Sequence, residues 1–175
     1  MVEQQDRIGQ CSINLSGQSL GDAAFTAFVL QALQHADVPC SKLCFEITET
    51  AAISNLHTAN HFIEALRASG CKISLDDFGS GLSSFAYLRN LPVDVLKIDG
   101  QFVRDIDRDP VSLAMVKSIH EIGCLMGKRT VAEFVESPAL VGILQKIGVH
   151  YAQGYAVGHP VPLAQVLEGH RAVLP

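Results

Sequence analysis

The residues of this chain that could carry out chemistry come at the ends of short apolar runs. Six such runs end in, or lead directly into, an amide, carboxylate or amine side chain: Asn14, Glu46, Asp76 with Asp77, Lys97 with Asp99, Glu133 and Gln153. Burying a carboxylate is costly unless it is paired or binds a cation. Oxygen ligands favour magnesium or manganese over zinc. Carboxylates gathered in one place would therefore predict a site for divalent cations.

The pair Asp76 and Asp77 indicates what such ions would do. Neighbouring aspartates at a strand end can hold two ions, one each or by bridging, and two-ion sites promote in-line displacement at phosphorus. Lys97 would then offset charge on a non-bridging phosphate oxygen. A single acidic residue after a strand is more often a turn or helix N-cap residue, so Asp77 could simply begin a loop. Six polar strand ends taken together favour the site.

The apolar runs have the character of strands in a parallel sheet. They are rich in Ile, Val, Leu and Phe, are too short for helices, and cover residues 10–15, 42–48, 72–76, 93–98, 129–134 and 149–152. Near-continuous apolarity, rather than strict alternation, is typical of strands buried on both faces. Each run is followed by a helical pattern, so the sequence predicts an α/β fold.

Capping residues mark where several of these helices begin and end. Asp109-Pro110 and Ser137-Pro138 each place an N-cap side chain before a proline at the first helical position. Gly70 and Gly148 follow periodic segments, where a left-handed residue is favoured. An apolar stripe over residues 52–66 predicts one amphipathic helix.

The C-terminal strand ends of a β/α barrel converge on one face, where such enzymes place their active sites. From Asn14 to Gln153 there are 139 residues in five steps, about 28 per unit. Eight units would need about 224 residues. The chain therefore has room for an incomplete TIM-like (β/α)8 barrel of about six βα units.

Composition limits the other possibilities. The chain has 175 residues, 48% of them hydrophobic, and a formal net charge of −5. This predicts one domain over residues 1–175, without disorder, a membrane span or a signal peptide, and therefore a cytoplasmic location. Mild acidity argues against binding to a DNA or RNA backbone. Five scattered cysteines argue against a disulfide or a zinc site, and Cys11, Cys44 and Cys71 are expected to be buried.

Six segments in order resemble the EAL domain family, the bacterial cyclic di-GMP phosphodiesterases. They are Ile13-Asn14-Leu15-Ser16, Phe45-Glu46-Ile47-Thr48-Glu49-Thr50, Asp76-Asp77-Phe78-Gly79-Ser80-Gly81, Leu91-Pro92-Val93-Asp94 through Lys97-Ile98-Asp99, Val131-Ala132-Glu133-Phe134-Val135-Glu136, and Gln153-Gly154-Tyr155. The resemblance implies a metal-dependent hydrolase that opens cyclic di-GMP to linear pGpG, with this chain as the C-terminal portion of the domain.

The resemblance also implies roles for individual residues. Asn14, Glu46 and Asp76 would bind a first Mg²⁺ or Mn²⁺, and Asp77 a second, with Asp76 shared. Lys97 would orient water or phosphate, and Glu133 would be a ligand or general base. Glu49 would tether the loop over residues 78–84. The other residues expected to bind substrate or support the site are Phe78, Gly79, Asp99, Glu136 and Gln153.

The family likeness further implies inhibition by Ca²⁺, a homodimer, and linked sensor or GGDEF domains, in a protein that could be membrane-anchored. The sequence departs from the family in three places. The Glu-Ala-Leu motif of the first strand would lie before Met1, and the Glu64-Ala65-Leu66 present is expected to lie on a solvated helix face. Phe134 stands where glycine is commonest, and Gly158-His159-Pro160 replaces Ser-Arg-Pro. We therefore expect a fragment of a larger protein with little or no activity of its own.

Three other functions remain open at this stage. The chain could be a receptor that binds cyclic di-GMP without cleaving it, or a partner-binding module using an exposed sheet edge. An enolase-like lyase is disfavoured, because its chemistry needs no adjacent aspartates before Phe-Gly. The pair His57 and His61 is expected to be exposed, and His120-Glu121 lacks the second histidine of a zinc-protease motif.

Overall fold

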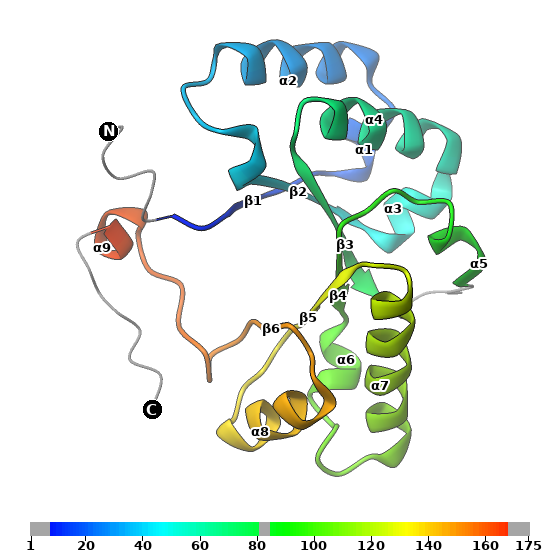
Figure 1. Ribbon diagram of the computed structural model, residues 1–175, viewed down its shortest axis with the longest axis vertical. Helices are drawn as coiled ribbons and strands as arrows, with labels where there is room; N and C mark the ends of the chain where they lie inside the picture. The colour runs from blue at the N-terminus through cyan, green and yellow to red at the C-terminus, as the bar shows by residue number, and fades with distance from the viewer. Residues whose placement is uncertain (1–7, 81–84, 168–175) are drawn as a thin grey trace.

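The computed structural model describes residues 8–80 and 85–167, and in it six parallel strands form one sheet. The strand order follows the chain, and the sheet curls into a half-barrel whose open side lies at the left of Figure 1. The strands are β1 (Cys11–Asn14), β2 (Leu43–Thr48), β3 (Lys72–Phe78), β4 (Val95–Ile98), β5 (Arg129–Ala132) and β6 (Tyr151–Ala152). Each predicted strand is present, and the predicted α/β barrel architecture is confirmed.

Helices connect successive strands and cover the convex side of the sheet (Figure 1). They are α1 (Gly17–Leu20), α2 (Ala23–His35), the short 3-10 helix η2 (Cys40–Lys42), α3 (Glu49–Ser54), α4 (Leu56–Ala68), α5 (Phe85–Leu88), α6 (Gly100–Val103), α7 (Pro110–Leu125) and α8 (Pro138–Ile147). The last helix, α9 (Leu163–Leu167), follows β6 and lies at the open side of the half-barrel (Figure 1). Among the residues described, no helix has the length and apolarity needed to cross a membrane.

The predicted helix caps are found where the sequence placed them. Asp109 accepts hydrogen bonds from the first backbone N–H groups of α7, and Ser137 does the same for α8. Gly148 ends α8 in the left-handed conformation, with φ 93°. These caps fix where the helices begin and end, and therefore where each following strand starts.

The single helix predicted over residues 52–66 is wrong. The segment forms two helices, α3 and α4, separated by Asn55, whose φ of −152° and ψ of 78° are not helical. The Asn55 side chain accepts a hydrogen bond from the backbone N–H of Thr58 and so begins α4. Ala52 and Ala59, on either side of the break, are both buried, so the apolar stripe continues across it. His57, His61 and Glu64 are exposed, as expected.

The hydrophobic core lies between the convex face of the sheet and the helices. On β2, Phe45 and Ile47 belong to this core, whereas Cys44 and Glu46 line the hollow on the other face. This alternation follows from the two-residue period of a strand. Cys44 and Cys71 are buried as expected, but the expectation for Cys11 is wrong, because β1 is an edge strand and its four residues are exposed.

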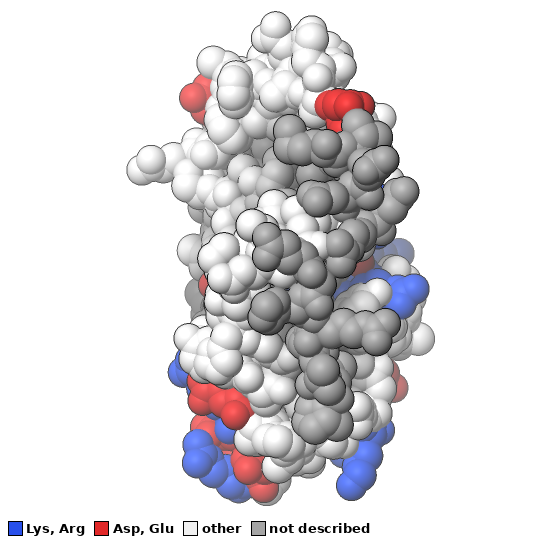
Figure 2. Space-filling model, turned by 90° about the vertical axis from the view of Figure 1, so that its left-hand side faces the viewer, with Lys and Arg blue, Asp and Glu red and all other residues white. Residues whose placement is uncertain are grey.

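The concave face of the half-barrel encloses an open hollow of about 1080 Å³. Polar side chains from successive strands line it, among them Ser12, Glu46, Ser74, Lys97 and Gln153. Figure 2 views the molecule from the open side, where acidic and basic side chains both gather in the lower part and few charges appear in the upper part. Three of the residues singled out from the sequence, Glu46, Lys97 and Gln153, therefore face this hollow, away from the core.

Candidate metal and phosphate site

The centre of the candidate site is Lys97, on the concave face of β4. Its side chain is buried, and its Nζ lies 3.0 Å from Glu46 Oε2, 2.8 Å from Asp76 Oδ1 and 2.9 Å from Glu133 Oε1. These three carboxylates come from β2, β3 and the segment after β5. The convergence predicted from the strand ends is therefore present around one ammonium group.

Strand register explains why residues so far apart in sequence meet. Glu46 pairs with Ser74 across β2 and β3, and Ser74 pairs with Val95 of β4. Asp76 and Lys97 each lie two residues further along their strands, so both project from the concave face near the C-terminal ends. Asn14 pairs with Glu46 at the end of β1, and is exposed beside it.

The pair Asp76 and Asp77 depends on an irregularity in β3. Successive residues of a regular strand point to opposite faces, which would send one of the two carboxylates into the core. The register between β3 and β4 shifts between Leu75 and Phe78, and Asp77 adopts a left-handed φ of 54°. Bulges of this kind redirect side chains near active sites. Asp76, Asp77 and Glu133 consequently offer oxygens that all lie within 4.8 Å of one another.

The charges in this cluster perturb one another. Burial alone would lower the pKa of Lys97, but hydrogen bonds with Asp76, Glu133 and Glu46 outweigh burial and raise the pKa above its usual value. Burial raises the pKa of Glu133 to about 7, although Lys97 opposes the shift. Burial and the neighbouring Asp76 also raise the pKa of Asp77. Three carboxyl groups contact a single ammonium and Asp77 lies beside two of them, so carboxyl groups outnumber positive charges in the site.

That excess fits a divalent cation. Asp76 Oδ1 is buried and lies 2.8 Å from the Lys97 ammonium, but that single positive charge is shared with Glu46 and Glu133. Several carboxylates that share one ammonium are disfavoured unless a further positive charge balances them. The available donors are carboxylate oxygens and the Asn14 amide, which suit Mg²⁺ or Mn²⁺. The residues present therefore fit the predicted metal ions.

A second group of contacts fixes the loop that follows β3. Glu49, at the start of α3, is fully buried and accepts a hydrogen bond from the backbone N–H of Gly79 at 2.9 Å. The Tyr87 hydroxyl donates to the other oxygen of Glu49. Phe78, just before Gly79, is fully buried in the core. Glu49 thus contacts the start of the predicted loop over residues 78–84, of which 81–84 lie outside the described part of the chain.

The remaining predicted residues lie around the rim. Asp99 follows β4 and caps α6 by accepting from the backbone N–H of Gln101. Gln153 follows β6; its side chain is exposed and lines the hollow, and its backbone carbonyl accepts from Val135 N–H. Glu136 is exposed, with no contact to the Lys97 cluster recorded for its side chain. The structure thus brings together Glu46, Asp76, Asp77, Lys97 and Glu133, with Asn14 beside them.

Sequence reasoning missed two side chains in this region. Ser74 is buried between Glu46 and Val95 in register, and its hydroxyl has no hydrogen-bond partner among the residues described. Tyr87 holds Glu49 from a helix 38 residues away. The small polar residue in the apolar run 72–76 was the available signal for Ser74. No local pattern indicated Tyr87, because the contact is set by tertiary packing.

Phe134 follows Glu133 and has a left-handed φ of 52°, a conformation that side chains rarely adopt. Its ring packs over Gly100, where an added Cβ would lie 2.1 Å from Phe134 Cδ2, and the Arg104 guanidinium lies 4.1 Å from the ring centre. This backbone conformation explains why glycine is suited to the position.

Comparison with known proteins agrees with this geometry. The sequence profile of the EAL domain matches residues 1–160. The chain belongs to the EAL domain family. It is 49% identical over 157 residues to the cyclic di-GMP phosphodiesterase PdeB of Shewanella oneidensis, in an alignment covering 90% of this chain and 18% of PdeB.

Solved structures of EAL proteins share the fold. The PaMucR phosphodiesterase in complex with c-di-GMP superposes with a TM-score of 0.85 and 33% identity, covering 93% of this chain and 69% of PaMucR. Klebsiella pneumoniae BlrP1, in a complex with calcium and cyclic di-GMP, superposes with a TM-score of 0.77 and 31% identity, over 83% of this chain and 37% of BlrP1. The chain spans about a fifth of the length of the curated relatives it matches.

Proposed function

We propose that this EAL chain carries the metal-binding part of an active site that hydrolyses cyclic di-GMP to linear pGpG. The observation that carries the proposal is the convergence of Glu46, Asp76 and Glu133 on the buried Lys97 ammonium. PdeB, which is named a cyclic di-GMP phosphodiesterase, and PaMucR, named as its c-di-GMP complex, support the choice of substrate.

The donor groups divide into two sets. Asn14, Glu46 and Asp76 would hold one Mg²⁺ or Mn²⁺, and Asp77 would hold a second together with Asp76. When bound, the ions would supply positive charge at the phosphate and lower the pKa of the attacking water. The bulge at Asp77 makes this division possible, because it turns both aspartates toward the same rim.

Two residues of the chain would act on the reacting groups. Lys97 stays protonated at neutral pH, so its ammonium would orient the carboxylates and offset charge on a phosphate oxygen. Glu133, with a pKa of about 7 in the metal-free protein, would accept a proton from the attacking water. Glu49 would act at a distance from the phosphate by holding Gly79 and the start of the loop after β3.

The 175-residue chain by itself is expected to turn over little or no cyclic di-GMP. The first-strand glutamate that the family resemblance implies is not among its residues, so one metal ligand would be missing. Ca²⁺ is expected to support ligand binding without turnover, and the calcium complex of BlrP1 is the basis for testing it. A homodimer and linked sensor or GGDEF domains stay predictions.

The proposal is tested by calorimetry of Mn²⁺ binding, followed by cyclic di-GMP binding in Ca²⁺ and by chromatography for pGpG in Mg²⁺. We expect metal and ligand binding in the wild-type chain and their loss in Asp76→Asn. Asp105→Asn is the matched control, because Asp105 pairs only with the exposed Arg108 among the contacts recorded. Metal and ligand binding unaffected by Asp76→Asn would overturn the proposal.

The turnover measurement distinguishes hydrolysis of cyclic di-GMP from binding without cleavage. PaMucR phosphodiesterase under the same conditions gives the reference rate. Turnover by this chain at a comparable rate would contradict the expected need for the first-strand glutamate. Ligand that survives intact in Mg²⁺ when a longer chain supplies that glutamate would instead identify a receptor.

A further inference from the structure

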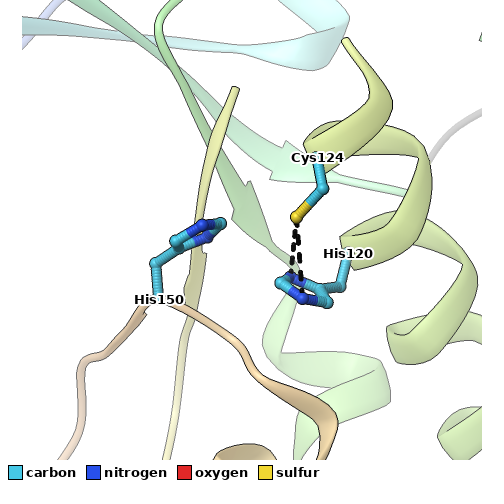
Figure 3. Close-up of side chains that lie close together, drawn as sticks. All are labelled: His120, Cys124 and His150. Atoms are coloured by element: carbon cyan, nitrogen blue, oxygen red, sulfur yellow. Dashed lines mark hydrogen bonds between the residues drawn. The ribbon is translucent and has the colours of Figure 1, made fainter. Parts of the chain in front are cut away.

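A second cluster of potential ligands lies near the other end of β5. His120 and Cys124 project from α7, and His150 comes from the segment just before β6 (Figure 3). Each side chain offers one donor atom, and these atoms all lie within 4.8 Å of one another. Cys124 Sγ is 3.6 Å from His120 Nε2. The proposed hydrolysis uses none of the three.

Regular structure places these residues together. His120 and Cys124 are four residues apart on α7 and therefore share one side of the helix. Because Val131 pairs with Tyr151 across β5 and β6, His150 lies beside Thr130. Thr130 is fully buried, with its Oγ1 2.8 Å from His120 Nδ1 and 3.0 Å from His150 Nδ1. The two imidazoles are thus positioned by a common hydroxyl.

We propose that His120, Cys124 and His150 bind a divalent ion of the zinc class. One thiolate and two imidazoles are the donors that Zn²⁺ prefers, whereas Mg²⁺ and Mn²⁺ prefer oxygen. In a four-coordinate ion, these three donors leave one position for water. The donor chemistry separates this site from the carboxylate cluster around Lys97, so the two sites would select different metals.

Two of the ligands are ready for the ion. When His120 Nδ1–H donates to Thr130 Oγ1, the Nε2 lone pair points to the Cys124 thiol, and an ion could take the place of the thiol proton between these two atoms. Cys124 is exposed, and its thiol would release a proton to solvent on binding the ion.

His150 must adjust. Its Nδ1 accepts a hydrogen bond from Thr130 N–H at 3.1 Å, so the ring carries its proton on Nε2. To bind the ion, the ring must break this hydrogen bond so that Nδ1 is available, or move its proton from Nε2 to Nδ1 so that Nε2 is available. One backbone hydrogen bond contributes less free energy than coordination by a thiolate and two imidazoles, so ion binding would be favourable despite the loss of this hydrogen bond.

The bound ion would have a structural effect. It would join α7 to the segment before β6. This strand has only two residues and lies at the edge of the sheet. Glu133 lies beyond the far end of β5, so the ion would stabilise the fold without entering the hydrolytic site. Loss of any one ligand is expected to weaken binding by about tenfold or more.

Cobalt is the probe for the test, because Co²⁺ reports both its ligands and its geometry by absorption. The metal-free, reduced 175-residue chain is titrated with Co²⁺ and then with Zn²⁺. We expect a thiolate-to-cobalt charge-transfer band and four-coordinate d–d bands at one equivalent, with displacement by Zn²⁺. Cys124→Ser should remove the charge-transfer band, and His150→Gln should weaken Co²⁺ binding at least about tenfold.

Three controls make the result specific. Cys11→Ser removes another exposed cysteine, and His57→Gln disrupts the exposed His57–His61 pair; both should leave the spectrum unchanged. Asp76→Asn should also leave it unchanged, so failure of the hydrolytic site and failure of this site are distinguishable. Thermal unfolding provides the second readout: Zn²⁺ should raise the midpoint of the wild type and not that of Cys124→Ser.

The absence of a charge-transfer band in the wild type would overturn the proposal and leave the three side chains as a hydrogen-bonded packing cluster. A band that persists in Cys124→Ser, with an unchanged Zn²⁺ effect on unfolding, would also overturn it.

Discussion

The two faces of the sheet are built from alternate residues of the same strands, and they differ sharply in chemistry. On the convex face, Ile47, Leu75 and Leu96 are fully buried against helices and need no polar partner. On the concave face, Glu46 and Lys97 are also buried but carry charge. Burial thus stabilises one face directly, whereas on the other it is tolerated only because opposite charges meet. The difference separates the residues that hold the fold from those that we propose to bind metal ions and substrate.

Removing the central ammonium should have the largest effect on the concave face. Lys97→Met would leave Glu46, Asp76 and Glu133 without their shared partner, and loss of one member of a buried ion pair costs about 3–5 kcal/mol. Urea unfolding in the presence of a chelator measures this loss. Lys117→Met, at an exposed site on α7, should change stability by less than about 0.5 kcal/mol. Equal effects of the two substitutions would show that the Lys97 cluster is not electrostatically coupled.

A matched pair of truncations compares the faces directly. Leu96→Ala removes a fully buried side chain from the core and should lower the free energy of unfolding by about 2–5 kcal/mol. Ser74→Ala, equally buried on the concave face, should cost less than about 1 kcal/mol, because its hydroxyl has no recorded partner to lose. Urea unfolding of both variants measures these free energies. A larger loss for Ser74→Ala than for Leu96→Ala would contradict the proposed difference between the two faces.

The positions of the elements were predictable from the sequence because strands and caps are local features. Six apolar runs gave the six strands, and Asp109 and Ser137 marked helix starts correctly. The break at Asn55 was not predictable, because the apolar stripe continues across it while the backbone turns. Cys11 was misjudged because edge position depends on the whole sheet.

The site was predictable in its composition but not in its detailed geometry. Polar residues at strand ends identified Glu46, Asp76, Lys97 and Glu133 as neighbours. The left-handed turn at Asp77 depends on a register shift between two strands, which residue types alone do not specify. The cluster of His120 with His150 was missed for a similar reason, since only the pairing of β5 with β6 brings them together.

The titration of Glu133 should make the stability of the protein depend on pH, with an effect smaller than that of removing Lys97. The raised pKa of Glu133, from 4.5 to about 7, means that the folded state holds a proton the unfolded state has released. The stabilisation that this proton gives the folded state is fully present below about pH 4.5 and is lost as the pH rises through 7, an effect on the order of 3 kcal/mol. Glu133→Gln should remove this pH dependence in metal-free unfolding curves. Glu136→Gln, exposed three residues away, should preserve it, and the same curves in both variants would contradict the assignment.

The contact that holds the loop after β3 should give a smaller effect than the titration of Glu133. Tyr87→Phe deletes one hydroxyl that donates to the fully buried Glu49, so unfolding should be easier by about 1–2 kcal/mol. Hydrogen exchange at the Gly79 amide should accelerate as well, because that N–H donates to the same carboxylate. Tyr151→Phe removes a hydroxyl from an exposed tyrosine and serves as the control. An unchanged exchange rate at the Gly79 amide would show that Tyr87 does not support the contact between Glu49 and Gly79.

Paramagnetic broadening of amide signals by Mn²⁺ tests most directly whether the concave rim is a cation site. At low Mn²⁺ we expect the signals of Asp77, Gly79 and Glu133 to broaden first, while those on α4, such as Ala65, persist. Asp76→Asn should remove this selectivity. Broadening that is spread evenly over the surface, or that is the same in Asp76→Asn, would contradict it.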